Sequence, residues 1–102
     1  MKKKKKIRIR GYDFDFRFTK RLSRVPDENN KPQIVDGFCE YPEHTKYPKI
    51  RIREGQEAFD EMDTVIHEII HAGAPKLNEE TVTEIAKVAT EVLRELGWVR
   101  MR

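Results

Sequence analysis

The sequence predicts an α+β fold, in which a small antiparallel β-sheet of about three to four strands is followed by two packed helices. In short segments of the first 53 residues, apolar and polar residues alternate, which is typical of strands with one buried face. From residue 59 onward, apolar residues recur with helical spacing in two blocks, separated by a glycine and a proline. Residues 1–102 can form a single two-layer core, so we expect one domain.

Strand periodicity appears in three parts of the first half of the chain. Lys6–Arg10 and Phe14–Phe18 alternate on either side of a possible turn at Gly11–Tyr12, which predicts a hairpin with one buried face. Val25–Pro32 is rich in Pro, Asn, Asp and Lys and predicts a loop. Two further strands are expected at Gln33–Tyr41 and Lys49–Arg53.

The two helices are located by their capping signals. The first is expected over Phe59–Ala72 and is ended by Gly73 and Pro75, and the second runs from a cap at Asn78 to about Leu96. Each has an apolar face, which we expect to cover the sheet. These faces consist of Phe59, Met62, Val65, Ile66, Ile69 and Ile70 in the first helix, and of Val82, Ile85, Ala86, Ala89, Val92, Leu93 and Leu96 in the second.

The first helix contains the pattern HExxH, as His67-Glu68-Ile69-Ile70-His71. Residues four apart share one face of a helix, so both imidazoles can bind one zinc ion, with Glu68 beside its water. At about 100° per residue, His67, Glu68 and His71 lie together opposite the apolar face, toward a cleft or solvent. The alternative is that they are ordinary exposed polar residues, but the agreement between motif and helix phase favours a metal site.

A zinc site needs at least one more ligand, and we expect it to be acidic. The only other histidine, His44, lies upstream in the sequence. Glu80 and Glu84 project from the polar side of the second helix, and the short connection Gly73–Leu77 brings the two polar faces together. Acids in a first helical turn also interact favourably with the helix dipole, so Glu79 and Glu80 have a purely structural explanation too.

These residues resemble the gluzincin metallopeptidases, in which a glutamate on the next helix completes an HExxH zinc site. Glu80-Thr81-Val82-Thr83-Glu84-Ile85 fits the pattern of that second helix. The resemblance implies that Glu80 is the third ligand and that Glu84 orients His67 or His71. The connection between His71 and Glu80 is shorter than in the large gluzincins, which leaves Glu84 as an alternative ligand.

The chain is also similar over most of its length to small phage and bacterial proteins that carry one HExxH helix. The similarity is specific from Asp63 onward, at the approach Met62–Glu68 to the motif and at the ending Leu96-Gly97-Trp98. It implies a minimal zincin-like zinc metallopeptidase acting on a peptide or protein substrate. In zincins the strand before the active helix can pair with an extended substrate, a role open to either of the last two predicted strands.

The implied ligand set predicts a mechanism. Two imidazoles and a carboxylate leave zinc an open position for water, and Glu68 would act as the general base when this water attacks a peptide carbonyl. The alternative function is a catalytically silent, zinc-stabilised module that binds protein or nucleic acid. The two differ in whether water or a side chain completes the zinc site. Cys39, Tyr41, His44 and Tyr47 lie in the irregular segment 37–48, where they can line the site or simply pack.

Charge and cysteine content bear on partners and location. Residues 1–26 carry eleven Lys or Arg against two Asp, whereas residues 27–102 carry ten against sixteen acids. The basic tail over residues 1–6, with Lys2–Lys6, permits nucleic-acid binding, but a solubilising role is the favoured interpretation. A single cysteine, and the absence of a signal-peptide-like or membrane-spanning apolar run, predict a cytoplasmic protein without membrane contact.

Overall fold

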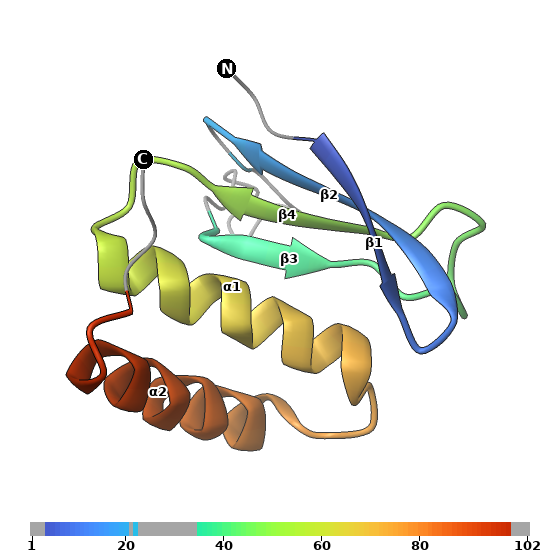
Figure 1. Cartoon of the computed structure of the whole chain (residues 1–102). Helices are drawn as coiled ribbons and strands as arrows, with labels where there is room; N and C mark the ends of the chain where they lie inside the picture. Colours follow the sequence, from blue (N-terminus) through green and yellow to red (C-terminus); the bar gives the residue numbers. More distant parts are fainter. Residues whose placement is uncertain (1–3, 21, 23–34, 99–102) are drawn as a thin grey trace, which may run out of the picture.

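The computed structural model describes residues 4–20, 22 and 35–98. The predicted loop Val25–Pro32, the start of the strand expected at Gln33–Tyr41 and part of the basic tail lie outside the described residues. Four strands are followed by two helices, and the sheet order is β1-β2-β4-β3 (Figure 1). This confirms the α+β fold. The elements are β1 Lys4–Ile9, β2 Tyr12–Thr19, β3 Gly37–Cys39, β4 Lys49–Arg53, α1 Ala58–Gly73 and α2 Glu79–Glu95.

The sheet is mixed, and this differs from the antiparallel sheet that we expected. The pairs β1–β2 and β3–β4 are antiparallel, but β2 and β4 run parallel, with Phe16 opposite Ile50. The chain crosses over after β2 and adds β4 beside it, with β3 outside β4. The edges of the described sheet are therefore β1 and β3.

The β1–β2 hairpin turns one residue earlier than expected, at Arg10–Gly11. Both residues have positive φ, 54° and 81°, as a two-residue type I′ turn requires. The side chain of Arg10 then donates a hydrogen bond from Nε to the carbonyl of Ala72, at 2.8 Å, which ties the hairpin to the end of α1. Lys4–Lys6, part of the predicted tail, belong to β1.

The core lies between α1 and the inner face of the sheet, with members from β2, β3 and β4. Its buried members are Phe14, Cys39, Ile50, Ile52 and Ala72. Only Val65 of the apolar face expected for α1 packs against this cluster, and Ile69 is exposed. The inward side of α1 carries Glu61, Glu68 and Ala72 instead, so the helix is rotated from the expected orientation.

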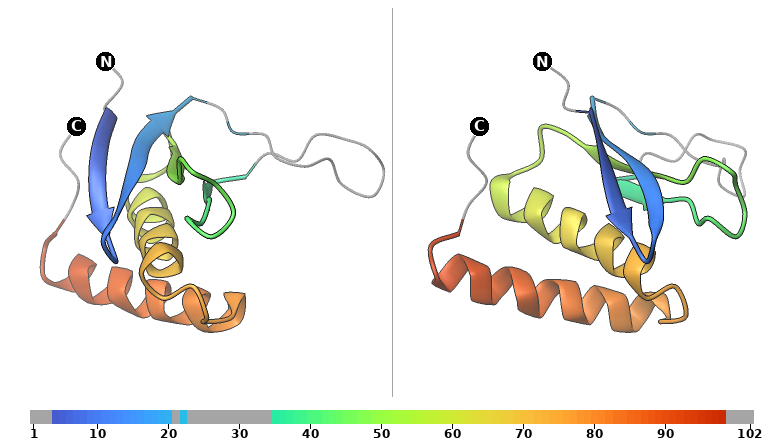
Figure 2. Two further views of the ribbon diagram at one scale, coloured as in Figure 1. Left: turned by 90° about the vertical axis from the view of Figure 1, so that its right-hand side faces the viewer. Right: turned by 45° about the vertical axis from the view of Figure 1, so that its right-hand side comes forward.

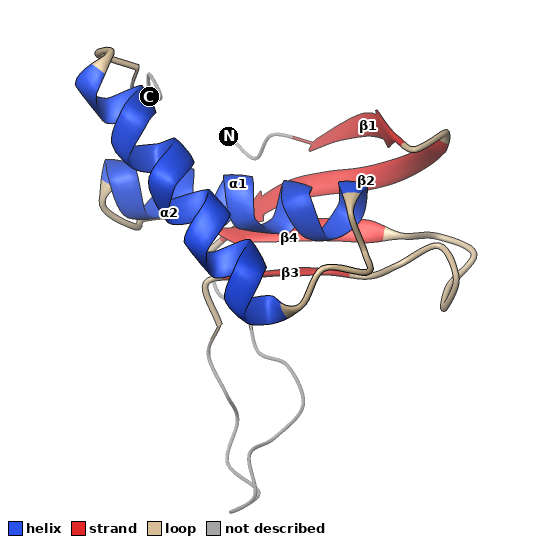
Figure 3. Ribbon diagram, turned by 90° about the horizontal axis from the view of Figure 1, so that it is seen from below, coloured by secondary structure: helices blue, strands red, loops and turns tan. Residues whose placement is uncertain are grey.

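α2 packs against α1 and not on the sheet, which corrects the expectation that both helices cover it. Figures 2 and 3 show α1 between the sheet and α2. The buried side of α2 is a narrow line of Val82, Ala86 and Thr90, one turn apart. Other apolar residues of the expected stripe remain exposed: Ile85, Val92 and Leu96.

None of the described helices has both the length and the apolar character needed to cross a membrane.

Candidate metal centre

His67 and His71 lie one turn apart on α1 and point toward the same place. Their ring centroids are 4.8 Å apart, and their Nε2 atoms are separated by 3.1 Å. Both side chains are largely buried, with 19 % and 15 % exposed. The HExxH spacing therefore brings two imidazole nitrogens together, as the sequence predicts.

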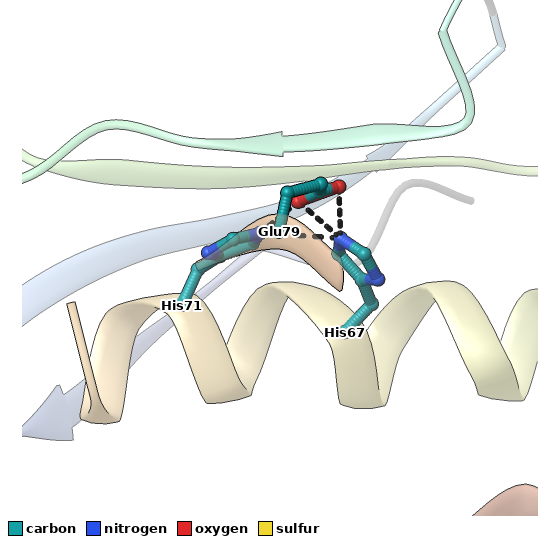
Figure 4. Close-up of side chains that lie close together, drawn as sticks. All are labelled: His67, His71 and Glu79. Atoms are coloured by element: carbon teal, nitrogen blue, oxygen red, sulfur yellow. Dashed lines mark hydrogen bonds and ion pairs between the residues drawn. The ribbon is translucent and has the colours of Figure 1, made fainter. Parts of the chain in front are cut away.

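A carboxylate from α2 completes this group, and it belongs to Glu79 (Figure 4). Oε1 lies 2.6 Å from Nε2 of His71, and both carboxylate oxygens lie 3.0 Å from Nε2 of His67. Glu79 is the first residue of α2, directly after Asn78, whose side chain accepts a hydrogen bond from the backbone N–H of Thr81 at 2.8 Å. The predicted cap thus fixes where α2 begins and so where Glu79 lies.

The spacing of these three donors fits a zinc ion. Ligand nitrogens about 2.0–2.1 Å from a tetrahedral zinc lie about 3.3 Å from one another. The separations of 3.0 Å and 3.1 Å are close to that value, whereas Oε1 of Glu79 and Nε2 of His71, at 2.6 Å, would have to move apart around an ion. One ligand atom from each of the three residues lies within 4.8 Å of the others. Two imidazoles and one carboxylate are also a common zinc ligand set.

The third residue differs from the prediction, because Glu80 and Glu84 do not join the group. Both are exposed on α2, as is Glu79, so helix phase and not burial separates the three. Glu79 precedes Val82 by three residues and Ala86 by seven, so it shares the side of α2 that packs against α1. Glu80 was predicted as the ligand because Glu80 and Glu84 match the second-helix pattern of the gluzincins. The signal that identifies Glu79 is its phase with the buried line of α2.

Glu84 was also expected to orient a zinc-binding histidine, but it makes no hydrogen bond to His71 in the described structure. Nδ1 of His71 is buried and has no hydrogen-bond partner among the described residues. Zinc-binding histidines usually donate this second N–H to a carboxylate or carbonyl. The ring of His71 is therefore held by packing and by its contacts with His67 and Glu79.

Glu79 is kept ionised by the two histidines. Partial burial acts to raise the pKa of its carboxyl group, but hydrogen bonds from His71 and His67 outweigh burial and lower the pKa. A carboxylate that is ionised at neutral pH can serve as a metal ligand without first losing a proton.

Glu68 lies deeper than the sequence suggests. It is only 7 % exposed, on the side of α1 that faces β3. A Cβ atom on Gly37 would be 2.7 Å from Cγ2 of Thr64 and 3.2 Å from Cγ of Glu68. The missing side chain at Gly37 therefore lets β3 approach α1 and places Glu68 under the edge strand, next to the two histidines.

A cavity of about 600 Å³ opens beside the histidines and Glu68. Its far wall includes Cys39, Tyr41 and His44, whereas Tyr47 lies outside it and is 76 % exposed. Burial raises the pKa of the Tyr41 hydroxyl, and the nearby charges of Cys39, Glu68 and Glu79 raise it further. Tyr41 is therefore a neutral hydrogen-bond donor at neutral pH.

A second hollow, of about 280 Å³, opens on the other side of the same residues. It shares Gly37, His67, Glu68 and Glu79 with the larger cavity, and we call these two adjoining hollows the groove. The wall of this hollow is formed by Asp36, Asp63, Thr64 and Thr83.

No protein-family model matches this chain, and neither does any curated protein or solved structure, so the case for the centre rests on its geometry.

Proposed function

We propose that this protein is a zinc-dependent metallopeptidase. The observation that carries the proposal is the convergence of His67, His71 and Glu79, whose ligand atoms lie within 4.8 Å of one another, beside an open cavity and next to Glu68. A bound zinc ion would lower the pKa of a water molecule and polarise the carbonyl that is attacked.

The residues of the chain have separate roles in this proposal. His67, His71 and Glu79 hold the metal ion. Glu68 accepts the proton of the attacking water, as a general base, and returns it to the leaving amine. Tyr41, across the cavity, is a donor suited to the negative charge that develops on the carbonyl oxygen.

The substrate is an extended peptide, placed along β3. This strand is an edge of the described sheet and is closest to α1 at Gly37, which lines both halves of the groove. An added strand can form main-chain hydrogen bonds with an edge, and this holds a peptide independently of its sequence. The β-augmentation expected for one of the last two strands is thus assigned to β3.

The silent binding module is less well supported by the arrangement of the site. A structural zinc site is usually closed by four protein ligands. Among the described residues, Cys39 and His44 line the cavity but do not belong to the group of His67, His71 and Glu79. A three-residue group that faces a cavity has room for water and substrate, as catalysis requires.

Nucleic-acid binding through the basic tail is the less favoured alternative. Most arginines of the outer sheet face are already matched with acids, as in the ion pairs Arg8–Asp13, Arg17–Asp15 and Arg53–Asp36. Such pairing reduces the positive field that would attract phosphates. The single cysteine favours a cytoplasmic location, which we include in the proposal.

The test uses the purified full-length chain and its Glu68→Gln variant. We expect about one zinc per chain in both, measured by elemental analysis, because Glu68 is not a ligand. Cleavage of unfolded protein or peptide substrates is expected only for the unchanged chain, with new termini identified by mass spectrometry. Zinc-free protein that takes up no added zinc, or full activity in the variant, would show that the proposal is wrong.

A further inference from the structure

The two halves of the groove differ in charge. Glu68 and Glu79 line both halves, and the further acid of the larger half, Glu40, is 3.9 Å from Nζ of Lys49. The smaller half is lined by Asp36 and Asp63 and by no basic residue. Beyond the two shared glutamates, the acid without an ion-pair partner within 4.0 Å among the described residues is Asp63, so the two halves differ by this one carboxylate.

Asp63 is the acid best placed to act on a substrate. It lies on α1 four residues before His67, so it is one turn from the metal group on nearly the same face. Burial raises the pKa of its carboxyl group and the charge of Asp60 raises it further, while the charges of His67 and, more weakly, Lys87 oppose this. Among the described residues, Asp63 has no ion-pair partner within 4.0 Å, unlike Asp36, which is held by Arg53 at 2.6 Å.

We propose that the groove selects peptides with a lysine or arginine side chain seated in the hollow beside Asp63, on one fixed side of the bond that is cut. This rests on the proposed peptidase function and adds a substrate class to it. A cation in the hollow offsets the cost of burying the carboxylate, whereas an acidic side chain at the same place is repelled. A small neutral side chain does not offset the cost of partly burying the charged carboxylate of Asp63.

The site is shaped for one side chain from an extended strand. Residue 36 borders the small hollow, Gly37 is shared by both halves, and residues 38–41 border the large cavity. A peptide paired with β3 therefore places residues on either side of the cut bond in different halves of the groove. Alternate side chains of an extended peptide point in opposite directions, so one position carries the selectivity.

The experiment measures cleavage of peptides that differ at one position at a time, with Lys, Arg, Ala or Glu. With the zinc-loaded chain, we expect Lys and Arg to be preferred over Glu at one position at least 10-fold in kcat/KM, with the cut mapped by mass spectrometry. Asp63→Asn is expected to reduce the preference for Lys over Ala to about one. Asp63→Lys is expected to reverse it, in favour of Glu.

The matched control is Glu91→Gln, which removes an exposed acid of α2 that neither lines the hollow nor acts on the charge of Asp63. It is expected to keep the preference of the unchanged chain. Zinc content and thermal unfolding are measured for all variants, so that a misfolded Asp63 variant is recognised. Reversal by Asp63→Lys with normal zinc content cannot come from misfolding.

The inference and the proposed function fail in different ways. Efficient cleavage with no preference at any position, or a preference that Asp63→Lys leaves unchanged, overturns the inference and leaves the peptidase in place. If no peptide is cut, the peptidase proposal fails, and binding decides the inference. Fluorescence anisotropy then compares the affinity of a labelled Lys peptide with that of its Glu counterpart. Tenfold tighter binding of the Lys peptide supports the inference that the hollow selects a cation, and equal affinity overturns it.

Discussion

The carboxylate of Glu79 reaches both histidines because Glu79 is the first residue of α2 and lies on the side of α2 that faces α1. The next residue, Glu80, is turned by about 100° around the helix axis and so points to solvent. Two adjacent glutamates of identical chemistry are thus separated by helix phase alone. The position of the cap at Asn78, which sets that phase, decides which of them can bind a metal ion.

This difference is measurable with single substitutions. Glu79→Gln is expected to weaken zinc binding by more than about 100-fold, because groups that merely support zinc ligands already contribute 10–100-fold. Glu80→Gln and Glu84→Gln, matched in chemistry and exposed on the same helix, are expected to bind zinc normally. Competition with a coloured chelator measures the affinities. Loss of zinc from Glu80→Gln alone would favour the ligand expected from the gluzincin pattern.

At the scale of elements, the close approach of β3 and α1 depends on Gly37. Its missing side chain leaves room for Thr64 and for Glu68, which would otherwise meet a Cβ atom at 2.7 Å and 3.2 Å. The contact also brings the edge strand, where a peptide would pair, next to the general base. One glycine therefore connects packing of the core with placement of the groove.

Gly37→Ala is expected to lower the free energy of unfolding by about 1–3 kcal/mol, as extra atoms in a packed site do. Its kcat is expected to fall as well, because β3 and Glu68 must move apart. Gly73→Ala is the control, since a Cβ there would meet only Cγ2 of Ile9, at 3.8 Å. Urea unfolding and peptidase assays compare the two. Equal stability and activity in both variants would mean that the approach of β3 tolerates a methyl group.

Element boundaries were largely predictable from the sequence, but the partners of the elements were not. The helix expected over Phe59–Ala72 spans Ala58–Gly73, and Asn78 caps the second helix as expected. Alternation in β2 shows which residues share a face, but it does not show that β4 pairs with β2 in parallel. Likewise, the apolar stripe of α2 gives no sign that α1, and not the sheet, covers part of it.

The same limit explains how far the site could be predicted. His67, Glu68 and His71 form a local pattern, so their spacing on one helix follows from sequence. The third residue depends on how two helices face each other, which is a tertiary property. The burial of Glu68 depends on β3, a strand that a glycine brings close and that lies about thirty residues earlier.

For the whole molecule, the candidate metal-binding group lies between α1 and α2, the helix that is not packed on the sheet. Among the described elements α2 packs mainly against α1, through a buried line of small residues, Val82, Ala86 and Thr90. Apolar residues of α2 remain exposed, so burial contributes less to holding it than its apolar content would allow. A zinc ion held by His67, His71 and Glu79 would cross-link α1 to α2 near the connection between them.

Removal of zinc is therefore expected to loosen α2 before the sheet. A ligand present at 100 times its Kd stabilises the folded state by about 2.7 kcal/mol, and in a chain of 102 residues this corresponds to about 10–20 °C in Tm. A chelator is expected to lower Tm by that amount and to raise hydrogen exchange in α2 more than in β4. His71→Ala is the control and is expected to show no response to the chelator.

The pH dependence of this stabilisation has a defined sign. Zinc binds deprotonated histidine and glutamate, so binding releases protons and weakens as the pH falls. Separately, the lowered pKa of Glu79 stabilises the metal-free fold: this contribution is present above the pKa of the unfolded chain and is lost as the pH falls through the lower folded pKa. The difference in Tm with and without zinc is thus expected to be large at neutral pH and to shrink in acid. A difference that is independent of pH would show that the metal ion is held by groups other than these three.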